Sequence, residues 1–139
     1  MLKSKKLIAL IGSTAVVLGS SLAASATTGS FSFSLDPNEN SGVGYSSYQT
    51  KNDNEDIAYI TPTSGNLVVS DLFYFSVANT SHRSIAGYIR FPGSNDSRVK
   101  YNTTIHCAYN SGENVAHRSA CLFGDTDRYN VSVNGRWTP

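Results

Sequence analysis

Apolar and polar residues alternate with a period of two along most of this chain, and this pattern constrains the fold more than any other feature. Beyond residue 30, large apolar residues recur at every second position in short runs, and no segment of ten or more residues carries an apolar stripe at helical spacing. Each run predicts a β-strand that buries one face. The clearest runs span residues 31–35, 73–77, 85–91, 99–107 and 129–133, and shorter candidates span 45–51, 57–61 and 67–70.

Turn-forming sequences separate these runs. Asp-Pro-Asn at 36–38, Ser-Gly-Asn at 64–66 and Asn-Ser-Gly at 110–112 are typical of loops between strands. Roughly eight or nine short strands with one apolar face each need a second sheet to cover them. We therefore predict an all-β fold, a single antiparallel β-sandwich of the immunoglobulin-like kind. A closed antiparallel barrel is the alternative, because it also removes exposed strand edges.

The first 26 residues predict export. Lys3, Lys5 and Lys6 precede an uncharged apolar stretch over residues 7–22, and Ala-Ser-Ala at 24–26 has the small-x-small pattern that signal peptidase cleaves. We expect a helical signal peptide over residues 1–26, cleavage after Ala26, and one secreted, extracellular domain over residues 27–139. The signal is of the Gram-positive bacterial kind. No second apolar run follows, so we expect no stable membrane span after cleavage.

The charge of the mature part bears on its partners. It carries eight Lys and Arg against ten Asp and Glu, a net charge of −2, whereas the whole chain is at +1 because three Lys leave with the signal peptide. A near-neutral domain has no electrostatic footprint for nucleic acid or for an anionic membrane surface. We therefore expect an extracellular target in the cell envelope or on another protein, and no nucleic-acid partner.

Cys107 and Cys121 are the only cysteines. An even number in an exported protein favours a disulfide, and both residues fall on predicted inward faces, so we predict a Cys107–Cys121 bridge. A tight hairpin between them would place them about 20 Å apart, so the bridge needs a wide connection or strands in different sheets. A Cys₂His₂ metal site with His106 and His117 is disfavoured by its spacing, and a catalytic Cys–His pair is disfavoured because such thiols oxidise outside the cell.

Known catalytic motifs are missing from the sequence. There is no Gly-x-Ser-x-Gly elbow, no His-Glu-x-x-His pair and no glycine-rich phosphate loop. We therefore expect a non-enzymatic protein without a cofactor. The acidic stretches 53–56 and 125–127 contain oxygen ligands of the kind Ca²⁺ prefers, but neither has the spacing of an EF-hand loop, which favours solvated turns.

Aromatic residues supply the candidate binding groups. Tyrosine suits adaptable recognition surfaces, and several tyrosines fall on polar strand faces or in the polar segment after residue 41. These recognition candidates are Tyr45, Tyr48, Tyr74 and Tyr88. Trp137, the only tryptophan, shares strand parity with Tyr129 and Val133, so we place all three in the core. Gly135 between them leaves room for a close neighbour.

The two ends of the mature chain are the most distinctive parts of its sequence. Phe-Ser-Phe-Ser-Leu at 31–35 and the ending at 129–139, which closes on Gly-Arg-Trp-Thr-Pro, resemble an uncharacterised family of small secreted proteins from low-GC Gram-positive bacteria. Members of that family have a Gly-x-Trp-x-Pro ending, and some are associated with bacteriocin-like peptides. The resemblance implies a role in competition or immunity, and it implies no catalytic residues.

Three classes of function are compatible with the sequence. The leading hypothesis is a secreted, non-enzymatic β-sandwich of unknown specific role that binds an extracellular target, with bacteriocin-like or accessory antagonism as one version. The first alternative is a small extracellular wall- or carbohydrate-active hydrolase, whose paired carboxylates need not be adjacent in sequence. The second is a self-associating surface or matrix protein that pairs through edge strands.

The export signal gives a direct prediction. Protein recovered from the medium of expressing Gram-positive cells should begin at Thr27, because residues 24–26 form the best-placed small-x-small site. Intact-mass spectrometry of the secreted protein measures this, and a mass that still includes residues 1–26 would contradict it.

Overall fold

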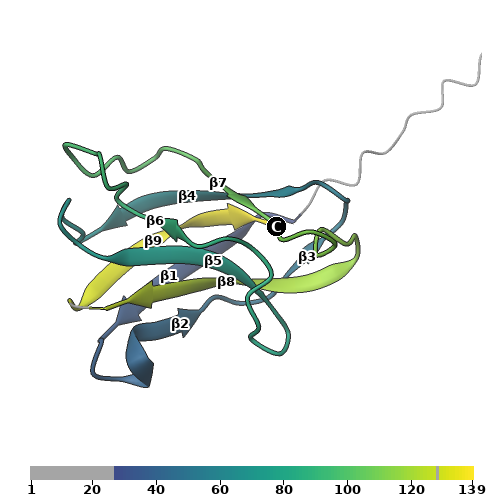
Figure 1. Ribbon diagram of the computed structural model, residues 1–139, viewed down its shortest axis with the longest axis horizontal. Helices are drawn as coiled ribbons and strands as arrows, with labels where there is room; N and C mark the ends of the chain where they lie inside the picture. The colour runs from purple at the N-terminus through teal and green to yellow at the C-terminus, as the bar shows by residue number, and fades with distance from the viewer. Residues whose placement is uncertain (1–26, 128) are drawn as a thin grey trace, which may run out of the picture.

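Two antiparallel β-sheets pack face to face to form a sandwich (Figure 1). The computed structural model describes residues 27–127 and 129–139, so the expected signal peptide lies outside the described residues. Within these residues one short 3₁₀ helix, η1 (Asn40–Gly42), accompanies nine strands. The strands are β1 (Gly29–Leu35), β2 (Val43–Tyr45), β3 (Gln49–Lys51), β4 (Ile57–Gly65), β5 (Phe73–Asn79), β6 (Ile89–Arg90), β7 (Ile105–Ala108), β8 (Arg118–Thr126) and β9 (Val131–Thr138). In this described part, no helix is long and apolar enough to cross a membrane.

The order of the strands identifies the kind of sandwich. One sheet runs β1-β9-β4-β7 and the other runs β2-β8-β5-β6, with β3 also pairing with β8. If β2 and β3 are counted as one interrupted strand, the strands pair from the two ends of the chain inward. β1 pairs with β9, β2 and β3 with β8, β4 with β7, and β5 with β6. This is the order of a jelly roll. The predicted antiparallel β-sandwich is confirmed, and within that class its strand order is the jelly-roll one rather than the immunoglobulin one.

Aromatic rings fill the space between the sheets. The ring centroids of Phe31 and Phe75 lie 5.5 Å apart, and those of Phe33 and Phe73 lie 6.3 Å apart, with all four rings buried. Such pairs stabilise a core by about 0.5–1.5 kcal/mol beyond the area they bury. Gly135 lies opposite Phe31 in the β1–β9 register, and a Cβ there would lie 2.5 Å from Phe31 Cζ. The expected close neighbours of this glycine are therefore the carbonyl oxygen of Thr61 and the ring of Phe31.

The alternating pattern overestimates the length of two strands. It predicts strands over 85–91 and 99–107, but only β6 and β7 form there. Ile85 and Phe91 are nevertheless buried, and their N–H groups donate to the carbonyls of Val77 and Phe73. The alternation therefore marks which side chains are buried, and not which backbone groups form a ladder. Similarly, the candidate strand over 45–51 is divided into β2 and β3, and residues 67–70 form no strand.

The side chains of β8 face the opposite way from the prediction. The sequence analysis places Cys121 on an inward face, but its neighbours Ala120 and Leu122 belong to the core between the sheets. Cys121 and Phe123 form a separate buried cluster with Ala78 on the outer face. The prediction is wrong because β8 is buried on both faces, and a strand buried on both faces has no alternation to reveal its orientation.

The predicted Cys107–Cys121 disulfide is also wrong, because both thiols are free and buried. Cys107 points into the core, where its thiol donates to the Gly87 carbonyl at 3.2 Å. Cys121 faces away from the core, and its Sγ lies 3.8 Å from the Ala78 carbonyl oxygen. One β-sheet therefore lies between the two thiols, and a bridge cannot form. Burial raises the pKa of each thiol to about 11, which keeps both protonated and unreactive.

The two aromatic residues of the last segment have different outcomes. Trp137 of β9 lies in the core as predicted, with 1% of its surface exposed, and pairs with Ile60 of β4 in register. Tyr129, which the same parity places in the core, precedes β9 and is 51% exposed. Parity predicts the orientation of a side chain only inside a strand, and β9 begins at Val131.

The state of the two cysteines can be tested by counting thiols. The native domain over residues 27–139 should not react with Ellman's reagent, because both thiols are buried and protonated. The same protein unfolded in guanidinium chloride without reductant should release two thiols per chain. If the unfolded protein shows no reactive thiols, the two cysteines form a disulfide, and this would contradict their separation by a β-sheet.

Truncation of Trp137 tests the placement of the last strand. Trp137→Ala should lower the free energy of unfolding by about 3–5 kcal/mol, because it removes a large buried aromatic ring. Tyr129→Ala is the matched control and should change that free energy by less than about 0.5 kcal/mol, because its ring is half exposed. Urea denaturation measures both. Similar small losses for the two variants would show that Trp137 is not in the core.

Candidate functional site

Aromatic side chains gather on the outer face of the β2-β8-β5-β6 sheet, on the side away from the core. We call this set the aromatic face, and its members are Tyr45, Tyr48, His82, Tyr88 and Phe123. Tyr45 of β2 and Phe123 of β8 are opposite each other in register, with ring centroids 5.4 Å apart. Tyr88 meets Phe123 edge to face at 5.6 Å. Phe123 is nearly buried and forms the base, whereas Tyr88 is 55% exposed.

His82 connects the two tyrosines that flank the β2–β3 interruption. Its imidazole stacks on the ring of Tyr45 with centroids 3.9 Å apart and planes 10° apart. The ring of Tyr48 is 14° from the imidazole plane, and its hydroxyl lies 3.2 Å from His82 Nε2. Tyr45 and Tyr48 stay 37% and 47% exposed despite these contacts. Rings that are already ordered lose little conformational entropy when a ligand binds.

The connection between β5 and β6 holds His82 in this position. Asn79 Oδ1 accepts hydrogen bonds from the N–H groups of Ser81 and Arg83, both at 3.0 Å, and its carbonyl accepts one from His82 N–H at 2.9 Å. Bonds from an asparagine to the backbone that follows it are common in turns. They hold His82 at a φ of +58°, a left-handed conformation that is uncommon for residues other than glycine, although histidine adopts it more often than most. Such conformations are concentrated at functional loops.

The same connection covers part of the sheet beneath it. The hydroxyl of Ser76 in β5 lies 2.9 Å from that of Ser84 and 3.1 Å from the Ala86 carbonyl oxygen. Ser76, Ala78 and Cys121 are consequently buried although they point away from the core. The aromatic face thus rests on a second, smaller packed layer.

Burial changes the proton affinity of two groups near the rings. It raises the pKa of the Tyr45 phenol, and the nearby Cys121 thiol and Asp125 carboxylate add to the shift. Burial also raises the pKa of Asp125, with a further contribution from Asp127. Tyr45 is therefore a neutral hydrogen-bond donor at physiological pH, and Asp125 adds a carboxyl group as an acceptor beside the rings.

Three of the four predicted recognition tyrosines come together at this site. Tyr45, Tyr48 and Tyr88 belong to the aromatic face, whereas no ring contact among the described residues joins Tyr74 to them. Tyr74 lies on the same side of the sheet, opposite Asp125 in register. Sequence reasoning missed His82. Asn79, two residues after the strand predicted over 73–77, was the available signal for an ordered turn.

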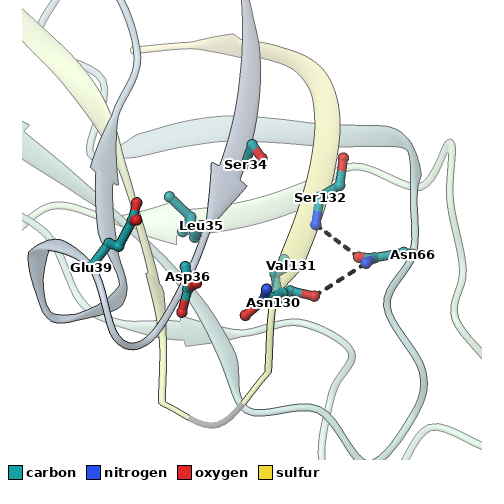
Figure 2. A pocket seen from close by; sticks show the side chains of 8 residues that line it. All are labelled: Ser34, Leu35, Asp36, Glu39, Asn66, Asn130, Val131 and Ser132. Carbon is teal, nitrogen blue, oxygen red and sulfur yellow. Dashed lines mark hydrogen bonds between the residues drawn. The ribbon is translucent and has the colours of Figure 1, made fainter.

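A polar pocket of about 320 Å³ lies at one end of the sandwich (Figure 2). On one side, Asn66 accepts a hydrogen bond from Ser132 N–H at 2.7 Å and donates one to the Asn130 carbonyl at 3.1 Å. Asp36 and Glu39 line the other side, where Asp36 already accepts hydrogen bonds from the turn that follows β1. The lining contains no aromatic ring, and Asn66 mainly ties the start of β9 to the β4–β5 connection.

The candidate metal ligands lie apart from one another. Among residues 27–127 and 129–139, no group of three or more His, Cys, Asp or Glu side chains is placed to hold a metal ion. His106 packs edge-on against Tyr59, with ring centroids 5.1 Å apart. In the acidic stretch 53–56, Asp53 pairs with Lys51 at 2.9 Å and Glu55 accepts a hydrogen bond from Tyr59. These carboxylates therefore have protein partners.

No family model, curated protein or solved structure matches this chain at a significant level. The function must therefore follow from the chemistry of the aromatic face and of the pockets.

Proposed function

We propose that the mature domain is an extracellular binding protein that attaches to a glycan of the cell envelope through the aromatic face. The observation that carries this proposal is that Tyr45, Tyr48 and Tyr88 are ordered by ring contacts and yet remain 37–55% exposed. Exposed apolar clusters on a soluble domain favour a binding role, and ordered aromatic side chains are the strongest anchors of binding surfaces.

The chemistry of the rings favours a sugar over a purely apolar partner. A pyranose has C–H groups on its two faces and hydroxyl groups around its edge. A tyrosine matches both, because its ring face is apolar and its hydroxyl donates and accepts hydrogen bonds. His82 and Asp125 add further polar groups beside the rings. A purely apolar partner would bury such groups without hydrogen bonds, at a cost of about 1–3 kcal/mol each.

The fold and the expected export agree with this proposal. Jelly rolls include lectin domains, although a shared fold by itself does not imply a shared function. An exported protein meets envelope glycans directly, and the sequence predicts export. The rings carry the proposal, and the fold and the export signal are consistent with it.

Antagonism of neighbouring cells, which the sequence resemblance implies, is one version of this proposal. A secreted antagonist also has to attach to the envelope of its target. Adding the purified protein to growing competitor cells distinguishes the two versions: inhibition at concentrations that saturate binding indicates an antagonist, and normal growth indicates attachment alone.

A cell-binding assay with matched variants tests the aromatic face. Labelled secreted protein is incubated with whole cells of producer and competitor strains, and the bound fraction is measured over a range of concentrations. Replacing Tyr48 and Tyr88 together by serine should weaken binding by about tenfold or more, because each removes an exposed ring that anchors the ligand. Tyr129→Ser removes a similarly exposed ring in the β8–β9 turn and should bind as the wild type does.

Protease treatment of the cells separates a glycan ligand from a protein ligand. Binding should survive digestion of the surface proteins and should be competed by soluble glycan released from the cell wall. Loss of binding after digestion would contradict the glycan assignment. Unchanged binding by the Tyr48/Tyr88 double variant would show that the ligand contacts another surface.

A further inference from the structure

A second pocket lies on the outer face of the β1-β9-β4-β7 sheet, on the opposite side of the sandwich from the aromatic face. Its volume is about 280 Å³, and its lining includes Thr28, Tyr59, Thr61, Thr104, Arg136 and Thr138. Arg136 belongs to β9, an inner strand, where it lies opposite Ser30 of β1 and Thr61 of β4. Because Trp137 is buried in the core, the residues on either side of it, Arg136 and Thr138, face outward.

The four threonine hydroxyls of this pocket form two pairs. The Oγ1 atoms of Thr28 and Thr138 lie 2.8 Å apart, and those of Thr61 and Thr104 lie 2.9 Å apart. A hydroxyl has one proton to donate. Within each pair one hydroxyl donates its proton to the other, so the second hydroxyl keeps a proton for a third group. The pocket therefore offers two O–H donors from ordered side chains.

Arg136 provides the charge at this pocket. In the part of the chain that the structure describes, its guanidinium makes no salt bridge or side-chain hydrogen bond. Three other arginines are engaged: Arg83 and Arg118 pair with Glu113, and Arg90 donates to backbone carbonyls. The guanidinium of Arg136 is thus available to an anionic ligand.

The surroundings of Arg136 on the sheet are uncharged. The outward positions of β1 and of the rest of β9 are Ser30, Ser32, Ser34, Ser132, Asn134 and Thr138. Tyr59 forms one wall of the pocket, and its hydroxyl donates to Glu55. This hydrogen bond holds the pKa of the Tyr59 phenol above its usual value, so the wall stays neutral. The Glu55 carboxylate at this wall is therefore already hydrogen-bonded.

We propose that this pocket binds the phosphate group of a phosphate ester. The planar guanidinium of Arg136 matches two phosphate oxygens at once, and the free threonine O–H groups supply the further donors that a phosphate accepts. The pocket is larger than a lone phosphate ion, so it has room for the organic part of an ester against the Tyr59 ring. The site lies on the opposite side of the molecule from the aromatic face and does not depend on the glycan proposal.

Isothermal titration of the secreted protein tests this site. The probes are glycerol 1-phosphate, soluble poly(glycerol phosphate), inorganic phosphate and acetate. Both esters should bind. Inorganic phosphate and acetate should bind at least about tenfold more weakly than the esters, or not at all. Arg136→Gln removes the charge at similar length and should weaken ester binding by about tenfold or more, as expected for a lost charged hydrogen bond. Thr104→Val, which removes one hydroxyl of a pair, should weaken it to a smaller extent.

Two controls make the result specific. Arg98→Gln removes another exposed arginine, in the β6–β7 connection outside the pocket, and should leave ester affinity unchanged. Thermal unfolding should show the same Tm for Arg136→Gln and wild type, because Arg136 is exposed. Ester affinity should also fall as salt is raised, because the contact is between exposed charges.

Several results would overturn the proposal. Equal ester affinities for the wild type and Arg136→Gln would show that Arg136 does not bind the phosphate, and so would the absence of ester binding by the wild type. Acetate or inorganic phosphate that binds as tightly as the esters would overturn the assignment to esters. If both esters bind, tighter binding of the polymer per phosphate supports an anionic polymer as the source, and tighter binding of the monoester supports a small molecule.

Discussion

The burial of β8 on both of its faces is the constraint on which the rest of this structure depends. On its inner face, Leu122 packs into the core between the sheets. On its outer face, Cys121 and Phe123 pack beneath the β5–β6 connection. The strand also has partners along both edges, with β2 and β3 on one side and β5 on the other. Each fully buried large side chain stabilises the fold by about 1.5–3 kcal/mol, so this one strand anchors both packed layers.

The aromatic face follows from that arrangement. Phe123 sits in the outer layer and gives Tyr45 and Tyr88 a fixed ring to pack against. The β5–β6 connection, ordered by Asn79, then brings His82 over the sheet to stack on Tyr45. The residues therefore have different tasks. Phe123 and the connection position the rings, and the exposed tyrosines are available to a ligand.

The sequence predicts the class of the fold because most strands bury only one face. Phe31, Phe33 and Leu35 alternate with serines, and Phe73 and Phe75 alternate with more polar residues, so these strands and their core faces could be assigned. The same reasoning fails at β8, where burial on both faces removes the alternation. The disulfide prediction fails for the same reason, since it depended on the orientation of Cys121. Residues 85–91 contain buried side chains outside the short strand β6, and this accounts for the strand that was predicted too long there.

The candidate sites differ in how far the sequence could predict them. Tyr45, Tyr48 and Tyr88 could be selected because they lie among polar residues in the sequence or on the polar face of a predicted strand. The pattern therefore does not assign them to the core. The role of His82 depends on a left-handed turn and on contacts with residues far away in sequence, which no local pattern reveals. The pocket around Arg136 depends on the register of three neighbouring strands, and a strand pattern alone does not fix register.

Hydroxyl-radical footprinting of the domain over residues 27–139, free and bound to isolated cell envelopes, tests the central claim most directly. If the aromatic face is the binding surface, Tyr48 and Tyr88 should become protected from oxidation in the bound protein, whereas Tyr129 should be oxidised equally in both states. Protein that binds envelopes while Tyr48 and Tyr88 stay as reactive as in the free state would contradict the account.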